Sequence, residues 1–334
     1  MRARGRKTEE NMKTRSRREV LKGSAATAGA AMLWTVLPSI RASTASPKAV
    51  AAPALKFPTT ARERLAVASW PFRAFIDSPA NSYRDKKQAG MDLKDFAATV
   101  KKDFGVPGVE PLSSHFPSTD ERYLHEFRET VEKAGVHVVN IPVESANSYY
   151  DGEAGARKLA VDNAKKWIDV AVVLGSPSVR TSIAEAKNAK PDVNVAVEQL
   201  KQVADYGARK KVIVTLENDN LVSEDAFFLV KVIEKVNHPY LRALPDFCNS
   251  MGSGNEKFNY DAVTALFPLA YSICHVKDSE AGDDGKVIRV DLKKTFGILK
   301  ASGYKGYCSM EWEGVGSSYD GTRFLIKSAL ENLG

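Results

Sequence analysis

Residues 212–217 read Val-Ile-Val-Thr-Leu-Glu, a short apolar run that ends in a carboxylate. Three later runs end in a similar way: Leu-Arg-Ala-Leu-Pro-Asp at 241–246, Ser-Ile-Cys-His at 272–275 and Tyr-Cys-Ser-Met-Glu at 307–311. The terminal residues are Glu217, Asp246, His275 and Glu311, which follow one another after 29, 29 and 36 residues. Strands of a barrel are buried on both faces, so an ionisable group at the carboxyl end of each indicates a functional site.

Eight apolar runs of this kind alternate with segments of helical period between residues 65 and 334. They are 65–70, 108–112, 136–142, 178–182, 212–217, 241–247, 272–277 and 307–312. Alternating strands and helices predict a parallel sheet, and eight units in about 270 residues fit a closed (β/α)8 TIM barrel. An open doubly wound sheet is the alternative, which we disfavour because no Gly-x-Gly-x-x-Gly follows the first strand.

In such a barrel the four terminal groups converge on one point. Three carboxylates and an imidazole suit one divalent cation, with Mn²⁺ favoured and Mg²⁺, Co²⁺ or Zn²⁺ as alternatives. Without a cation, the three carboxylates would repel one another strongly. Residues two apart share a strand face, so Glu313 is the main rival of Glu311 for the role of metal ligand. By the same rule, Asp219 lies on the face of Glu217, and Lys277 lies on the face of His275.

Four motifs resemble those of the sugar phosphate isomerase/epimerase family of xylose isomerase-like TIM barrels. They are Thr-Leu-Glu-Asn (215–218), Leu-Pro-Asp-Phe (244–247), Cys-His-Val-Lys-Asp (274–278) and Gly-Tyr-Lys-Gly-Tyr-Cys-Ser-Met-Glu-Trp-Glu-Gly (303–314). The resemblance covers roughly residues 65–330. It implies that Glu217, Asp246, His275 and Glu311 bind one divalent metal ion, and that Glu217 and Glu311 double as the acid/base pair, as in ketose 3-epimerases.

The implied activity is metal-dependent sugar isomerisation or epimerisation, in which a proton next to a carbonyl moves through an enediolate. The alternative is a lyase, such as a 3-keto-glycoside eliminase or an inosose dehydratase, that uses the same metal site. The chain departs from the ketose 3-epimerases at two substrate contacts, where it carries Asn249 in place of a His and Ala281 in place of an Arg.

Six residues are candidates for binding the sugar. Lys277 offers a cationic contact in place of the missing Arg, and the others lie near the carboxyl ends of strands. The set is Lys277, Asn249, Glu110, Arg180, Trp70 and His115. A purely structural role, as a core or loop residue, is the alternative for Glu110, Arg180, Trp70 and His115.

The net charge of +7 lies entirely in residues 1–45, which hold ten Lys or Arg and three Glu. There, Ser-Arg-Arg-Glu-Val-Leu-Lys (16–22) resembles a twin-arginine export signal, and a weakly apolar stretch and small residues follow it. We expect a signal peptide at 1–45, a linker at 46–62 and one catalytic barrel at 63–334, with a membrane anchor or a disordered basic arm as the alternative for the first segment. The protein would then be periplasmic or secreted, and the twin-arginine export machinery would be one of its partners. The sequence leaves open whether the protein forms a homo-oligomer.

Other classes of function fit less well. The mature chain is neutral, which argues against a nucleic-acid partner, and its five His are too few and too scattered for the tri-zinc site of the related endonucleases. The Glu217/Glu311 pair argues against a sugar-binding module without turnover. The three cysteines form no disulfide framework, and we expect them to be buried as small apolar residues.

The export signal is testable in a bacterium that has a twin-arginine pathway. Replacing Arg17 and Arg18 together by Lys should leave the protein inside the cell, because the receptor reads the Arg pair. Cell fractionation followed by immunoblotting measures the distribution, with Arg15→Lys as the control. Export of the double variant at the wild-type level would contradict the signal.

Overall fold

The computed structural model describes residues 50–281 and 286–334. The expected signal peptide at 1–45 lies outside these residues. Among the described residues, no helix has both the length and the apolar character that a membrane span requires.

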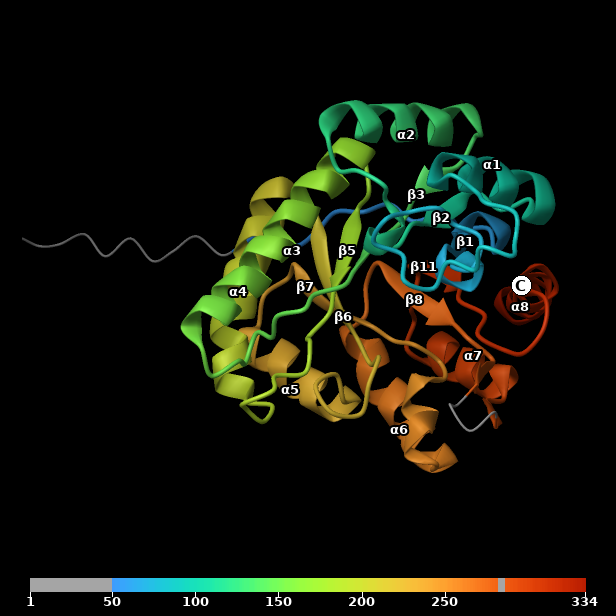
Figure 1. Cartoon of the computed structure of the whole chain (residues 1–334). Coiled ribbons are helices and arrows are strands. Elements are labelled where there is room, and N and C mark those ends of the chain that lie inside the picture. Colours follow the sequence, from blue (N-terminus) through green and yellow to red (C-terminus); the bar gives the residue numbers. More distant parts are fainter. Residues whose placement is uncertain (1–49, 282–285) are drawn as a thin grey trace, which may run out of the picture. The chain divides into compact units, whose positions relative to one another are not determined.

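The described chain forms a closed barrel of parallel strands surrounded by helices (Figure 1). The strands of the barrel are β1 (Leu65–Ala68), β2 (Gly108–Glu110), β3 (His137–Val138), β4 (Pro142–Val143), β5 (Ser178–Thr181), β6 (Ile213–Glu217), β7 (Leu241–Leu244), β8 (Ile273–Val276) and β11 (Tyr307–Met310). β3 and β4 are the two ends of the third strand position of the barrel, called the third stave below, which is interrupted at 139–141. The predicted (β/α)8 fold is therefore confirmed, with a strand in each of the eight expected runs.

Two sheets make up the wall, in the orders β3-β2-β1-β11-β8 and β4-β5-β6-β7. The interrupted third stave joins them on one side. On the other side, parallel bridges pair Ala243 with Ala270 and Asp246 with His275. The second bridge is held by the backbone of His275, which donates to the Pro245 carbonyl over 3.0 Å. The closure of the barrel therefore brings Asp246 and His275 side by side.

The chain between successive strand positions of the barrel contains a helix that packs on the outside, and an eighth helix follows β11. The helices are α1 (Leu93–Phe104), α2 (Glu121–Lys133), α3 (Ala154–Leu174), α4 (Val193–Lys210), α5 (Ala226–Val236), α6 (Glu256–Leu266), α7 (Leu292–Ala301) and α8 (Ser318–Leu333). Most begin after an Asp, Asn or Ser whose side chain accepts a backbone N–H of the first turn, as Asp225 and Asp291 do. A short antiparallel hairpin, β9 (Ser279–Ala281) and β10 (Val287–Arg289), follows β8.

The hydrophobic core has two parts. The larger part fills the space between the strands and the helices. The smaller one, Ala66, Val139, Leu244 and Ile273, is separate from it. Leu244 and Ile273 share strand faces with Asp246 and His275, so this cluster lies inside the barrel below the polar ends of the strands. An apolar plug thus separates the polar end from the opposite end.

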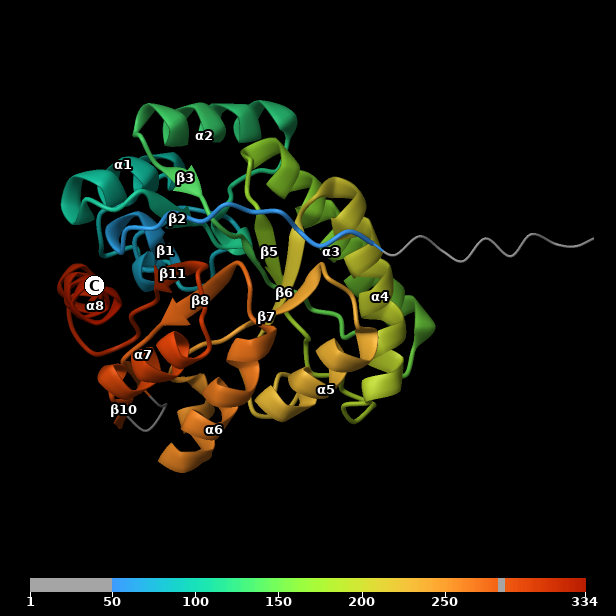
Figure 2. The ribbon, with the colours of Figure 1, turned by 180° about the vertical axis from the view of Figure 1, so that it is seen from behind.

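The segment before β1 crosses the amino-terminal end of the barrel (Figure 2). The Tyr271 hydroxyl donates to the Pro53 carbonyl over 2.9 Å and accepts from the backbone N–H of Leu55 over 3.3 Å. The Phe57 ring lies edge-on to Tyr271 and Tyr307, with centroids 5.4 and 5.7 Å away. These contacts fasten residues 53–57, part of the stretch expected as a linker, to the starts of β8 and β11.

The packing of α4 on β6 gives a test of this architecture. A Cβ added at Gly207 in α4 would lie 2.5 Å from the carbonyl oxygen of Val212. Ala normally stabilises a helix by about 1 kcal/mol relative to Gly, whereas overpacking a core costs about 1–3 kcal/mol. We therefore expect Gly207→Ala to lower the free energy of unfolding, as measured by urea denaturation.

Gly297 in α7 is the matched control. No atom lies within 4 Å of the position of its added Cβ, and the residue is exposed. Gly297→Ala should therefore raise the free energy of unfolding. If both variants were stabilised to the same extent, the close approach of α4 to β6 would be wrong.

Candidate metal centre

Four side chains meet at the carboxyl end of the barrel. Glu217 ends β6, Asp246 follows β7, His275 lies in β8 and Glu311 follows β11. One ligand atom from each lies within 4.8 Å of the others, and all four residues are buried. This cluster of three carboxylates and one imidazole, which could hold one metal ion, is called the metal centre below.

The imidazole of His275 lies at the middle of the metal centre. Its Nδ1 is 2.7 Å from Glu217 Oε1 and 3.2 Å from Glu311 Oε2. The same nitrogen therefore faces two of the three carboxylates. A cation that replaced the proton on this nitrogen would keep the same ligand atoms around it.

Asp246 is held by one of its oxygens only. Oδ1 accepts the backbone N–H groups of Cys248 and Asn249 over 2.7 and 2.6 Å. Oδ2 is buried and has no hydrogen-bond partner. A buried carboxylate oxygen without a partner is costly, and ligation of a cation is the ordinary way to satisfy it. The donor set of three carboxylates and an imidazole thus fits a divalent cation.

The pKa shifts in the metal centre also favour a positive charge among its carboxylates. Burial raises the pKa of Asp246 well above its usual value, and the neighbouring Glu217 and Glu311 raise it further, while Lys277 opposes the rise. Burial also raises the pKa of Glu311. Burial would lower the pKa of His275, but the surrounding carboxylates, including Glu110, hold it well above its usual value. The three carboxylates are thus stabilised by a positive charge among them, which a proton or a cation can supply.

Glu110 lies on the other side of the His275 ring. Its two carboxylate oxygens are 3.0 and 3.1 Å from His275 Nε2. Asn140 donates to Glu110 Oε1 over 2.7 Å, and it accepts at Oδ1 from the Ser178 hydroxyl over 2.8 Å. Burial would raise the pKa of Glu110, but His275 lowers it below the usual value. Glu110 is therefore an ionised partner of His275.

Arg180 neutralises a second group of carboxylates. Its Nε lies 2.9 Å from Glu217 Oε2, and its guanidinium is 2.6 Å from Asp219 and 3.8 Å from Glu224. Glu224 also accepts the backbone N–H of Ile183 over 2.6 Å. Burial raises the pKa of Glu224 to about 8, although Arg180 opposes this rise. All the cationic charge of Arg180 is thus used within the protein.

Lys277 is similarly occupied. Its ammonium donates to Glu313, to Asn249 Oδ1 over 2.7 Å and to Glu280 over 3.0 Å. Glu313 also accepts the indole N–H of Trp70. Glu313, the expected rival of Glu311, therefore belongs to this ion-pair network, while Glu311 contacts His275.

His115 is buried away from solvent. Its Nδ1 is 2.8 Å from the Ser69 hydroxyl, which also accepts the backbone N–H of Leu112. Burial lowers the pKa of His115 to about 3, and Arg73 contributes to this shift. A neutral histidine with these partners holds together the loops that follow β1 and β2.

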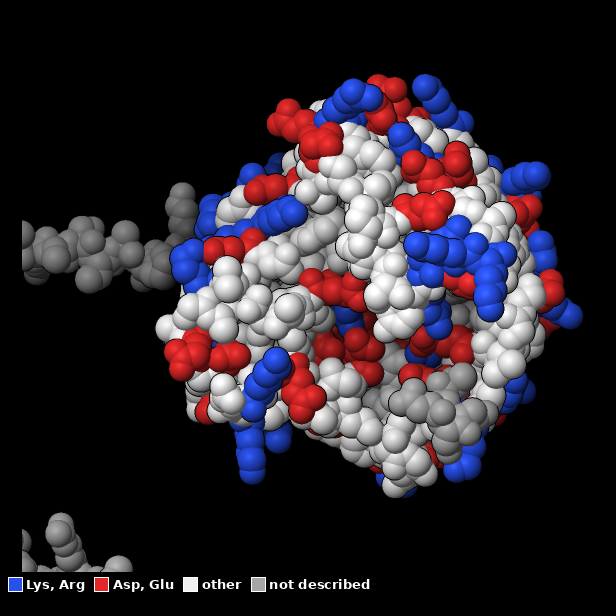
Figure 3. Space-filling view, in the orientation of Figure 1, with Lys and Arg blue, Asp and Glu red and all other residues white. Residues whose placement is uncertain are grey.

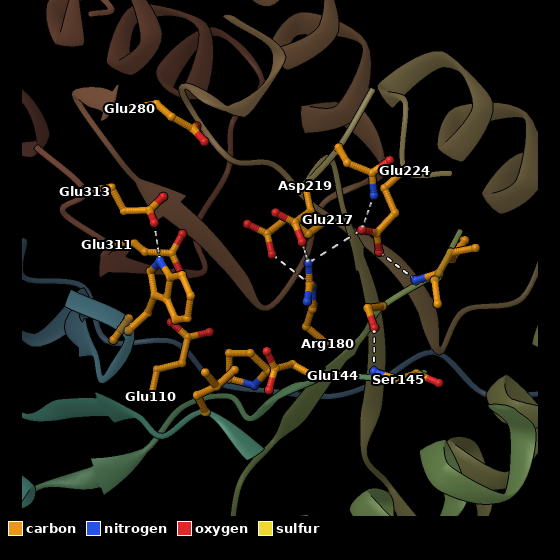
Figure 4. Close-up of a pocket in the computed structure, with 18 residues that line it drawn as sticks. Glu110, Glu144, Ser145, Arg180, Glu217, Asp219, Glu224, Glu280, Glu311 and Glu313 are labelled. Atoms are coloured by element: carbon orange, nitrogen blue, oxygen red, sulfur yellow. Dashed lines mark hydrogen bonds and ion pairs between the residues drawn. The ribbon is translucent and has the colours of Figure 1, made fainter. Parts of the chain in front are cut away.

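A cavity of about 410 Å³ opens onto the metal centre (Figure 4). Eight of its lining residues are Asp or Glu, and Figure 4 labels all of them. The space-filling view shows acidic side chains gathered in the hollow of this face (Figure 3). Glu144 is exposed at the wall, and no ion pair of its carboxylate with another described residue is found. The cavity is therefore strongly acidic.

The expected substrate-binding residues fall into two groups. Glu110, Arg180 and Trp70 line the cavity, whereas Lys277, Asn249 and His115 are buried and do not line it. The sequence did not single out Asn140, Glu144 or Glu224. Glu224 stands directly before Asp225, the cap of α5, and its place in the sequence is therefore that of an ordinary helix start. The cysteines are free and buried, as expected.

The family model of the xylose isomerase-like TIM barrel matches residues 99–332, and the chain belongs to this family. No curated protein matches the sequence. Among solved structures, D-allulose 3-epimerase from Methylomonas sp. is 15% identical with a TM-score of 0.62, over 83% of this chain and 100% of that one.

Two other solved structures are similar. A xylose isomerase-like TIM barrel protein from Mycobacterium smegmatis, in complex with magnesium, is 17% identical with a TM-score of 0.59, over 82% of this chain and 99% of that one. The 3-keto-D-glucoside 4-epimerase from E. coli is 13% identical with a TM-score of 0.57, over 79% and 99%. At these identities the likeness shows the fold.

Adding a divalent cation should stabilise the protein. Because the cation replaces repulsion among Glu217, Asp246 and Glu311 by attraction, we expect the melting temperature to rise with Mn²⁺ concentration. The free energy of unfolding should increase by about 2.7 kcal/mol when the free Mn²⁺ concentration is a hundred times the dissociation constant. The gain in stability should shrink as the pH falls, because the pKa values of His275, Asp246 and Glu311 are raised and these groups must lose protons to bind the cation.

Asp246→Asn is the matched control for this measurement. The amide oxygen can still accept the N–H groups of Cys248 and Asn249, so the variant should fold. Its melting temperature should hardly respond to Mn²⁺. A variant that is stabilised as strongly as the wild type would show that the cation binds elsewhere.

Proposed function

We propose that the protein is a metal-dependent sugar isomerase or epimerase. The observation that carries this proposal is the position of the metal centre. Four ligand-type groups lie within 4.8 Å of one another, next to a cavity at the carboxyl end of a barrel of the xylose isomerase-like family. Active sites of TIM barrels lie at this end.

The reaction is the transfer of a proton at a carbon next to a carbonyl group. A divalent cation at the metal centre would polarise the carbonyl oxygen and stabilise the negative charge of the enediolate. A carboxylate of the protein takes the proton, and the electron pair of the broken C–H bond moves into the enediolate. Return of a proton to the opposite face gives an epimer, and its return to the neighbouring carbon gives an aldose–ketose isomer.

Glu311 is the carboxylate best placed to move this proton. It lines the cavity, and its Oε1 makes no hydrogen bond or ion pair with another described residue, while Oε2 faces His275. Glu217 lines the cavity too, but its two oxygens contact His275 and Arg180. We assign the first proton transfer to Glu311 and the complementary one to Glu217.

The charge of the cavity favours an uncharged sugar. Eight acidic side chains line it, and the ammonium and guanidinium groups of Lys277 and Arg180 are already paired with carboxylates. A sugar phosphate would bring two more negative charges and would find no unpaired cation among these groups. With export by the twin-arginine route as part of the proposal, the substrate is a neutral keto-sugar or 3-keto-glycoside outside the cytoplasm.

The proposal is tested by incubating the Mn²⁺-loaded protein in D₂O with neutral keto-sugars and 3-keto-glycosides, and following hydrogen exchange by NMR. Glu311→Gln should lower the exchange rate at least a hundredfold, because a positioned acid or base contributes about 10²–10⁴ to the rate. Glu331→Gln, on the exposed side of α8, is the control for purification and folding.

The products decide between the two candidate reactions. A new epimer or isomer supports the proposal, whereas loss of the aglycone from a 3-keto-glycoside identifies the lyase alternative. Full exchange by Glu311→Gln, with its metal content unchanged, would rule out Glu311 as the acid/base group.

A further inference from the structure

We infer that Glu110 is a positioning residue, which fixes the orientation and tautomer of His275 so that Nδ1 faces the cation. The inference rests on the metal centre of the proposed function and does not depend on which sugar reacts. Glu110 is a candidate substrate-binding residue in the sequence because it lies at the end of β2. The structure gives it a different role.

The two ring nitrogens of His275 face different partners. Nδ1 points toward Glu217 and Glu311, with distances of 2.7 and 3.2 Å. Nε2 points away from them, to the two oxygens of Glu110 at 3.0 and 3.1 Å. A neutral imidazole carries one N–H, and the nitrogen that binds a cation must be the other one. Glu110 therefore holds the N–H at Nε2 and leaves the Nδ1 lone pair for the cation.

Glu110 is itself held in place. It is 0% exposed, and Asn140 donates to its Oε1 over 2.7 Å. The Asn140 amide is oriented in turn by the Ser178 hydroxyl, which donates to Oδ1 over 2.8 Å. Asn140 lies where the third stave is interrupted between β3 and β4. A row of buried hydrogen bonds thus runs from β5 across the barrel interior to His275 in β8.

The geometry also separates Glu110 from the other carboxylates of the cavity. Both of its oxygens are directed at the same ring nitrogen, whereas Glu144, on the same wall, has no ion-pair partner among the described residues. Replacing either by Gln removes one negative charge from the cavity. Only the change at Glu110 alters the hydrogen bond to His275, because a Gln amide can donate to Nε2 and so favour the wrong tautomer.

The test measures Mn²⁺ affinity by electron paramagnetic resonance titration, which needs no substrate. We expect Glu110→Gln to weaken binding ten- to a hundredfold, as second-sphere carboxylate changes do. Glu144→Gln should leave the affinity unchanged. Glu110→Asp keeps an ionised acceptor and should recover part of the loss. Circular dichroism of each variant checks that it is folded.

A spectroscopic readout identifies the tautomer directly. In the Zn²⁺-loaded protein labelled with ¹⁵N-histidine, the protonated ring nitrogen of His275 should be Nε2 in the wild type. This signal should weaken or disappear in Glu110→Gln. A loaded wild-type protein in which Nδ1 carries the proton would overturn the inference.

The other outcomes are equally decisive. Wild-type Mn²⁺ affinity in Glu110→Gln, with only an increased KM for the sugar, would make Glu110 a substrate contact. Equal weakening by Glu110→Gln and Glu144→Gln would reduce the effect to general charge. A wild-type protein that binds no divalent cation would refute the metal centre itself, whereas tight binding without hydrogen exchange in any sugar would refute only the proposed reaction.

Discussion

Repulsion among three buried carboxylates is the constraint on which the rest of the site depends. Glu217, Asp246 and Glu311 lie within 4.8 Å of one another and of His275, where little water can screen them. Such an arrangement costs several kcal/mol for each uncompensated charge. The four backbones are held at the carboxyl ends of β6, β7, β8 and β11, so the strands of the barrel fix the positions of these side chains. Compensation must then come from a positive charge in the centre.

The cationic side chains around the metal centre do not neutralise its three carboxylates. Arg180 and Lys277 are the cations nearest to it, and each is paired with several carboxylates. Arg180 contacts only Glu217 among the four, and Lys277 contacts none of them, since its partners are Glu280, Glu313 and Asn249. Asp246 Oδ2 therefore remains without a partner although two cationic side chains are close. The positive charge that these carboxylates require is therefore left for a proton or a cation to supply.

The sequence contained enough to predict the fold and the position of the four ligand-type residues. Each of them ends or follows an apolar run, and the carboxyl ends of parallel strands meet at one end of a barrel, so local pattern and parity suffice. The partners of Glu110 and Arg180 could not be predicted in this way. Glu110 meets His275 from 165 residues away and Arg180 meets Glu217 across a strand pair, and such contacts depend on register and on side-chain rotamers.

Asn140 shows why these partners matter beyond the site. Asn140 lies at the break between β3 and β4. In the sequence, this position is only a polar residue within an apolar run, and no pattern predicts the break. The break lets the side chain turn into the barrel, where it meets Glu110 and Ser178. A buried polar network is stable only when every member is satisfied. The interruption between β3 and β4 thus places Asn140 where it holds Glu110 against His275, four strands away in the wall.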